Sequence, residues 1–341
     1  MGTVNEDAAS SLIDHRLAVL RYESGTIADL LSTYDRALAS VTTELEAAYS
    51  RLLAGLEVDD RQRLRLEALR ADLMDKMRDL NAAQVATMNE RLAEIAAAER
   101  AYLGRTLFAV IGLPLASVPS EQVALMLTDA IGGAVWRDRL AVDLIAVEGG
   151  LRSALGEALA RGLSTNRTAA LLRGLNIPQT YRGRLVAIAR TETQRVANQV
   201  ALATYQRNAD VLDAVQWLAT LDRRTCPVCG SLHNAVYPLV GGIPVGLERA
   251  PPAHPRCRCF LAPVVKSWRD LGITTDPRYD GTPAPDITFE AWLRAQPAAT
   301  ADDVFGKGVA ARWRSGDLRL DQLVSNLRPL TLGELSARYP E

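Results

Sequence analysis

The residue types best suited to chemistry gather in one stretch, residues 217–260. The cysteines there form a C-x-x-C pair and, after a loop, a C-x-C pair preceded by a histidine. Donor pairs at both ends of a loop are typical of a zinc site, because zinc prefers four sulfur or nitrogen ligands in a tetrahedron. The stretch holds all 4 cysteines of the chain and two of its 3 histidines: Cys226, Cys229, Cys257, Cys259, His233 and His254.

Five of these side chains compete for four ligand positions. Cys226, Cys229 and Cys257 are the strongest candidates, and either His254 or Cys259 would complete the set. The sequence leaves Cys₃His and Cys₄ ligation open. The alternatives are two disulfides, or reduced cysteines without a metal. We expect no disulfides, because the N-terminal segment carries charges and lacks the apolar core of a signal peptide, which indicates a reducing compartment.

The predicted zinc is structural. A catalytic zinc keeps an open ligand position and needs a general base nearby. The motif H-E-x-x-H is absent, and Pro255 follows His254 where a zinc deaminase would have x-Glu. We therefore expect no enzymatic activity. The competing hypothesis is a zinc-containing hydrolase of nucleic acid or cell wall, for which Glu192 and Glu248 are the nearby candidate bases.

Arginines flank both cysteine pairs, and their guanidinium groups could contact phosphate. The chain has 39 basic and 40 acidic residues, so its formal net charge is −1. This balance excludes a binder of nucleic acid over its whole surface but leaves a local patch open. A DNA-binding module is thus a further alternative, with these candidate contacts: Arg223, Arg224, Arg256 and Arg258.

Short strands are expected around the cysteines. Residues 215–220 form a predicted strand with Trp217 in the core, and residues 236–240 and 243–245 form a predicted hairpin. Gly241-Gly242 supplies the turn between them. This hairpin would return the chain from the first cysteine pair to the second.

The remainder is predicted to be helical. Residues 7–21 form a short helix, and residues 27–52 carry a heptad seam that begins Ile27, Leu31, Tyr34, Leu38. A second long helix starts near Asp60 and would fold back on the first, either as a core or as a coiled-coil arm for oligomerisation or docking. No run of 18 apolar residues is present, so we expect no transmembrane helix.

Further helices follow in the middle and at the end of the chain. The one at 179–207 contains Arg190 and Glu192, which form either a solvated charged pair or a buried link to the strands. Thr331 and Glu334 form a capping box. The other predicted helices are 121–131, 136–161, 165–173, 288–295, 300–314 and 318–324.

The predicted fold is mainly α, with a long N-terminal helical hairpin and a small α+β module stapled by zinc. Four segments are expected: a long-helix arm at 1–110, a helical region at 111–215, a β-rich zinc module at 216–268, and an extended tail with short helices at 269–341.

Three motifs in this order resemble the phage head-morphogenesis family, the minor head proteins similar to protein F of phage Mu. They are A-R-T-E-T at 189–193, D-R-R-T-C-P-V-C-G-S-L at 222–232 and P-P-A-H-P-R-C-R-C at 251–259. Tail elements at 304–308, 313–318 and 330–332 extend the resemblance to roughly residues 150–341. The family usually has Asp-Gly or a similar pair after the C-x-x-C, where this chain has His233-Asn234.

The resemblance implies a minor capsid protein of a tailed phage or prophage. Such a protein acts in head assembly and in genome packaging or delivery. Its implied partners are the portal protein, the major capsid or scaffold protein, and genomic DNA. The implied location is the virion, inside the head or at the portal vertex, after assembly in the host cytoplasm.

Overall fold

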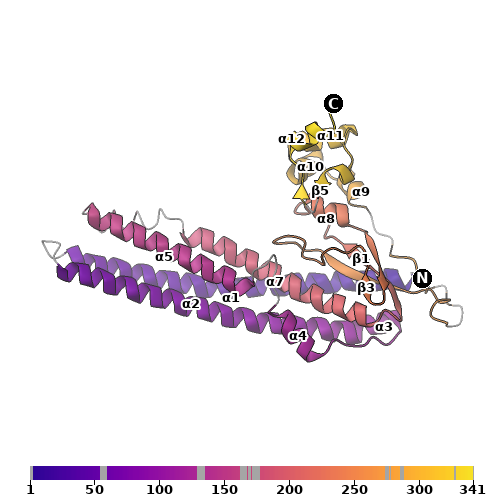
Figure 1. Cartoon of the computed structure of the whole chain (residues 1–341), viewed down its shortest axis with the longest axis horizontal. Coiled ribbons are helices and arrows are strands. Elements are labelled where there is room, and N and C mark those ends of the chain that lie inside the picture. The colour runs from indigo at the N-terminus through magenta and orange to yellow at the C-terminus, as the bar shows by residue number, and fades with distance from the viewer. Residues whose placement is uncertain are drawn as a thin grey trace. The chain divides into compact units, whose positions relative to one another are not determined.

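The computed structural model describes residues 3–53, 60–128, 135–161, 167, 170, 177–272, 276, 278–284, 288–325 and 328–340. The described chain is mostly helical with a small antiparallel sheet, as the sequence predicts (Figure 1). It forms two compact units, whose limits cut across the four predicted segments. Unit 1 comprises 1–19, 95–126 and 193–341, and unit 2 comprises 20–94 and 127–192.

Two long helices dominate the N-terminal third, α1 (Val4–Leu53) and α2 (Asp60–Ala101). They run antiparallel, because Ser11 meets Tyr102 in unit 1 whereas Asp29 meets Arg91 in unit 2. The prediction of separate helices at 7–21 and 27–52 is wrong, since α1 continues through Gly25. A glycine inside a helix costs about 1 kcal/mol but does not end it when side chains on either side are packed.

The heptad seam can be followed only at its start. Ile27 and Tyr34 are buried as predicted, and Leu30 is buried more deeply than its neighbour Leu31. The side chains from Leu38 to the end of the seam lie outside the described residues, so a coiled coil stays a prediction. On α2 the buried apolar side chains include Met77, Leu80, Met88, Leu92 and Ile95.

The sheet has the strand order β3-β2-β1-β4, with antiparallel neighbours. The predicted hairpin is β2 and β3, and Gly241 and Gly242 take positive φ angles of 58° and 81° at its turn. Such a two-residue turn needs glycine because both positions are left-handed. Strand β4 was not predicted, because all six of its residues are buried and show no alternation. The strands are β1 (Leu212–Leu218), β2 (Val236–Val240), β3 (Ile243–Pro244) and β4 (Phe260–Val265).

The middle helices agree with the sequence except at their ends. The predicted helix 121–131 is shorter, because the helix ends at Met126 and residues 127–128 form a turn. Of the predicted helix 165–173, only residues 167 and 170 are described, and both are helical. Within the described ranges, every helix is too short or too polar to traverse a lipid bilayer. The elements are η1, a π-helical turn (Tyr102–Leu107), α3 (Phe108–Ile111), α4 (Ser120–Met126), α5 (Trp136–Ala160) and α7 (Ile177–Arg207).

The start of α1 is fastened to the sheet in unit 1. The side-chain oxygen of Asn5 accepts the Val265 N–H at 2.8 Å, and its amide donates to the Thr282 carbonyl at 2.8 Å. The Val4 N–H donates to the Arg278 carbonyl. These bonds explain why the first turns of the helical hairpin belong with the sheet and not with a separate arm.

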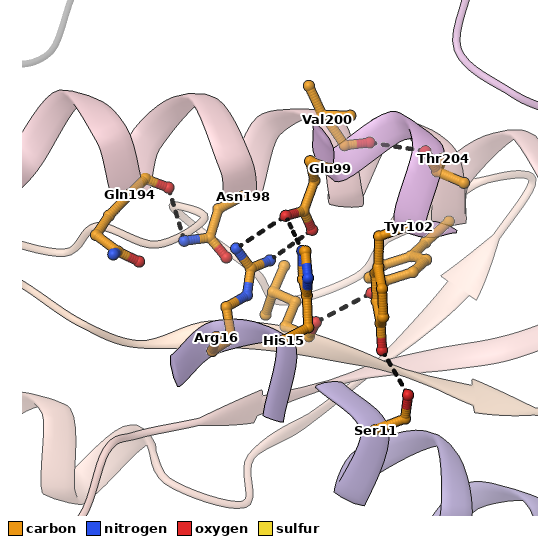
Figure 2. A network of polar contacts seen from close by, with 11 residues as sticks. Ser11, His15, Arg16, Glu99, Tyr102, Gln194, Asn198, Val200 and Thr204 are labelled. Carbon is orange, nitrogen blue, oxygen red and sulfur yellow. Dashed lines mark hydrogen bonds and ion pairs between the residues drawn. The ribbon is translucent and has the colours of Figure 1, made fainter. Parts of the chain in front are cut away.

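A buried carboxylate joins α1 to α2 beside the sheet (Figure 2). Glu99 accepts hydrogen bonds from Arg16 at 3.0 Å and from His15 at 2.8 Å, and its side chain is fully buried. The ring of His15 stacks on Tyr102 at 3.7 Å, and the Arg16 guanidinium lies over Phe260 of β4. A buried carboxylate needs such compensation, because a lone buried charge is strongly destabilising.

The C-terminal tail folds around Phe289 and Trp313, both almost fully buried. The predicted helix 300–314 is two helices, because Gly306 interrupts it with a φ of 80°. The predicted capping box of Thr331 and Glu334 is present. The elements are α9 (Phe289–Arg294), α10 (Ala298–Phe305), α11 (Lys307–Ser315), η2 (Leu320–Gln322), β5 (Val324–Ser325), β6 (Arg328–Pro329) and α12 (Leu332–Arg338).

The tail docks through Gly230, which follows the C-x-x-C pair in α8 (Pro227–Leu232). A Cβ atom there would lie 2.2 Å from Cδ1 of Phe289. We predict that Gly230→Ala lowers the free energy of unfolding by about 1–3 kcal/mol, the usual cost of overpacking. Gly333→Ala is the matched control, since a Cβ there meets nothing within 4 Å. Equal chemical-denaturation midpoints for both variants would contradict this packing.

Candidate metal centre

The first cysteine pair is shaped by the start of α8. Cys226 is the N-cap, and its Sγ accepts a hydrogen bond from the Cys229 N–H at 3.4 Å. Pro227 occupies the first helical turn, where its missing N–H is no loss. The extended backbone of Cys226 and the helical backbone of Cys229 bring the two sulfur atoms together at one end of α8.

The second group of donors arrives after the β2–β3 hairpin, in the turn before β4. The Cys257 N–H donates to the His254 carbonyl at 3.1 Å, which folds the segment back on itself. Arg256 within this turn has a φ of 64°. Asn234, which follows the first cysteine pair, likewise has a φ of 68°. Asparagine tolerates this left-handed conformation better than most residues, so the turn forms without glycine.

All five predicted donors come together. Nε2 of His254 lies 3.1 Å from Sγ of Cys226 and 3.0 Å from Sγ of Cys229. Sγ of Cys229 lies 3.7 Å from Sγ of Cys257. Cys229 also belongs to a second triad with Cys257 and Cys259, whose ligand atoms all lie within 4.8 Å of one another.

The donors fit a metal ion that prefers sulfur and nitrogen. A tetrahedral zinc with bonds of about 2.3 Å places neighbouring sulfurs about 3.8 Å apart, and the Cys229–Cys257 distance is 3.7 Å. All four cysteines are free of disulfides. Among the described residues, neither triad includes a carboxylate. The two triads keep both completions open, with His254 in one and Cys259 in the other.

Without a metal, the cluster shares protons unevenly. A hydrogen bond from Cys229 and one from His254 lower the pKa of Cys226 to about 4. Hydrogen bonds from Cys229 and Cys259 lower the pKa of Cys257 to about 2, and the bond to Cys226 raises the pKa of His254 to about 9. Donating its proton to Cys226 raises the pKa of Cys229. A hydrogen bond from Cys229 lowers the pKa of Cys259, but the neighbouring Cys257 and burial outweigh it and raise that pKa. Metal binding must therefore displace protons from Cys229 and from whichever of His254 and Cys259 completes the site, and acid opposes it.

An ion pair joins the segment of the first cysteine pair to the segment of the second donor group. Asp222, just before the first cysteine pair, accepts two hydrogen bonds from Arg258, at 2.5 and 2.6 Å. Burial opposes ionisation of Asp222, but the bonds from Arg258 and the Arg224 N–H outweigh it and lower the pKa of the carboxyl. Such a bidentate pair fixes geometry as well as adding energy.

Helix α7 contacts the segment that carries the second group of metal donors. The amide of Asn198 is fully buried and donates to the carbonyl oxygen of Gln194 (Figure 2). It also donates to the carbonyl oxygen of Cys259 at 3.1 Å. Asn198 is not among the site residues predicted from the sequence, because its role depends on a carbonyl group far away in the chain.

The remaining predicted site residues have separate places. Arg223, Arg224 and Arg256 are exposed, whereas Arg258 is engaged with Asp222. His233 lies outside both triads, and its Nδ1 accepts the Ala219 N–H.

The three residues predicted to have structural roles lie in different surroundings. Trp217 is buried in β1, and Glu192 is also almost fully buried. Arg190 pairs with Glu23 of α1 at 3.2 Å, within unit 2. Of the two alternatives stated for this pair, a solvated charged face is therefore wrong for Glu192, and burial is confirmed for it.

One comparison with known proteins gives a match. Residues 150–262 fit the family model described as Phage Mu protein F like protein. This segment is phage Mu F-like. The match begins within α5 and ends in β4, so it contains α7, the β2–β3 hairpin and both donor groups. The resemblance of residues 263–341 stays a prediction. No curated protein and no solved structure matches the chain.

We predict that Cys226→Ser abolishes metal binding and exposes residues 217–260 to protease, while the helices keep their circular dichroism. The reason is that the small sheet module would lose its cross-link. Metal content by mass spectrometry of the intact protein and limited proteolysis measure the two effects. Ser231→Ala, in the same helix, is the control, and unchanged protease resistance of Cys226→Ser would contradict a structural role for the cluster.

We predict that Asp222→Asn destabilises the protein at pH 7 by about 1 kcal/mol, a value kept small because Asp222 is partly exposed and screened. The pKa of Asp222 is lowered by folding, so its contribution is present above its unfolded pKa of about 4. That contribution is lost as the pH falls through the folded pKa. Urea unfolding from pH 7 downward should therefore show Asp222→Asn and wild type converging, whereas the control Asp213→Asn should match wild type at every pH. A constant difference at all pH values would contradict the ion pair.

Proposed function

We propose that this chain is a minor head protein of a tailed phage or prophage, with a structural and assembly role and no enzymatic activity. The observation that carries the proposal is the Phage Mu F-like match over residues 150–262, which encloses both donor groups of the metal centre. The matched segment contains α7, strands β1 to β3, the start of β4 and all five metal donors.

In this proposal the metal is zinc and its role is structural. Two of the four strands are short or partly exposed, and a hairpin on a small sheet gains little from burial. A zinc ion bound by thiolates and one further donor would supply the missing stability by joining α8 to the start of β4. The absence of carboxylates from both triads, among the described residues, supports a closed site over a hydrolytic one.

The proposed partners are the portal protein and the major capsid or scaffold protein, and the proposed location is the virion, inside the head or at the portal vertex. Contact with genomic DNA is a second proposal, supported by the exposure of Arg223, Arg224 and Arg256 beside the metal centre. Arg258 is excluded from that role because Asp222 already occupies its guanidinium group.

The test is co-expression of the tagged full-length chain with the portal, scaffold and major capsid proteins of the same genome. We predict that the chain co-purifies with the portal protein and carries about one zinc per copy, as a single closed site requires. The variant with Arg223, Arg224 and Arg256 changed to Ala measures the DNA contribution separately, by the salt dependence of DNA affinity.

Two outcomes would contradict the proposal. One is a chain that binds zinc but associates with none of the head proteins. The other is hydrolysis of DNA or cell wall that is lost in Glu192→Gln or Glu248→Gln with folding intact, which would favour the enzyme hypothesis instead.

A further inference from the structure

Helix α8 links the metal donors to the C-terminal tail. Cys229 belongs to both donor triads, and Gly230, the next residue, is buried in α8. The tail elements α9, η2, β5 and β6 all contact α8. One short helix therefore carries a shared metal donor and also the attachment of the tail.

An aromatic ring makes a close contact between the tail and α8. A Cβ atom on Gly230 would lie 2.2, 2.4 and 2.7 Å from Cδ1, Cε1 and Cγ of Phe289, so the ring rests on the backbone of Gly230. A residue without a Cβ atom is needed for so close an approach. Because Cys229 is bonded to Gly230, the position of the ring bears directly on the backbone of Cys229.

The position of the ring is set by the tail. Phe289 is 1% exposed, stacks on Trp292 with ring centroids 5.7 Å apart, and meets Phe305 edge to face at 6.4 Å. It is the first residue of α9, where the Thr288 hydroxyl caps the helix by accepting the Ala291 N–H at 3.1 Å. The folded tail thus presents the ring in one orientation.

The position of α8, in contrast, depends on its surroundings. The helix has six residues, and isolated helices shorter than about 12–15 residues are marginal in water. Leu221, which precedes the first cysteine pair, also packs against the tail cluster that contains Phe289. The tail therefore contacts the first donor segment both before and after its cysteines.

We propose that Phe289 is a positioning residue of the metal centre, which seats Gly230 and thereby places Cys229 among the other donors. Metal binding and docking of the tail both need α8 in one place, and metal ligands must lie within about 0.2 Å of their ideal distances. The two events therefore strengthen each other, and by linkage each does so by the same factor. The proposal rests on the structural zinc of the proposed function but not on the role in head assembly.

The test is the zinc affinity of the full-length, reduced protein, measured by competition with a chromogenic chelator. We expect Phe289→Ala and Gly230→Ala each to weaken zinc binding at least about fivefold, the lower end of typical coupling between sites. In the Phe289→Ala background, Gly230→Ala should add little, because the ring atoms that a Cβ would meet are gone. Gly333→Ala is the matched control, since it adds a methyl group to a tail helix with nothing within 4 Å.

The reciprocal measurement is hydrogen exchange in the tail. Removal of zinc should raise the exchange of residues 289–305 in wild type, and should raise it less in Phe289→Ala, where docking is already weakened. A residue that only stabilises the tail would leave zinc affinity unchanged.

Three outcomes would overturn the proposal. Both single variants could bind about one zinc per chain with wild-type affinity, which would remove the positioning role and leave the structural zinc in place. Gly230→Ala could weaken zinc binding as much without the Phe289 ring as with it, so that the methyl group acts on the centre directly. Wild type could bind no zinc, which would overturn the structural zinc as well.

Discussion

Cys229 lies in both triads of metal donors, within reach of His254 on one side and of Cys257 and Cys259 on the other. The geometry of the sheet module depends on this convergence. Between Cys229 and His254 the chain makes a hairpin whose outward side is apolar and exposed, so the hairpin adds little burial of its own. The two ends of this hairpin segment stay together because the Cys229 thiol and the His254 imidazole meet there. The ion pair between Asp222 and Arg258 joins the same two segments.

The two segments that carry the metal donors are held in place by polar contacts from distant parts of the chain. Asn198 of α7 fixes the Cys259 carbonyl, and Asn5 at the start of α1 fixes the end of β4. The Glu99 network places Arg16 over Phe260, the first residue of β4. Each contact satisfies a buried polar group, so the loss of one partner would leave the other at a cost of about 1–3 kcal/mol. Unit 1 is thus assembled from three stretches of sequence around one short strand.

Local chemistry could be predicted from the sequence, and long-range partners could not. The types and spacing of the cysteines and His254 predicted the cluster of metal donors, because a metal ligand is recognised by its residue type. Gly241-Gly242 predicted the hairpin, because positive φ angles favour glycine. The capping box at Thr331 is equally local. In contrast, β4 has no alternation, and its identity as a strand follows from pairing with β1.

The same limit applies within the candidate site. In the sequence Arg258 resembles the other arginines near the cysteines, and only its two guanidinium hydrogen bonds to Asp222 separate it from Arg223 and Arg224. The role of Asn198 depends on a carbonyl group 61 residues away. The choice between His254 and Cys259 is likewise set by the position of the metal among the five donors.

The measurement that tests the structural metal centre most directly is X-ray absorption at the zinc edge of the full-length protein, purified without chelator. The account predicts a closed first shell of sulfur at about 2.3 Å, with at most one nitrogen at about 2.0 Å and no oxygen. A four-sulfur shell would assign Cys259, and a three-sulfur, one-nitrogen shell would assign His254. Zinc bound with water or carboxylate oxygen, or a folded protein that binds no zinc, would contradict the central claim.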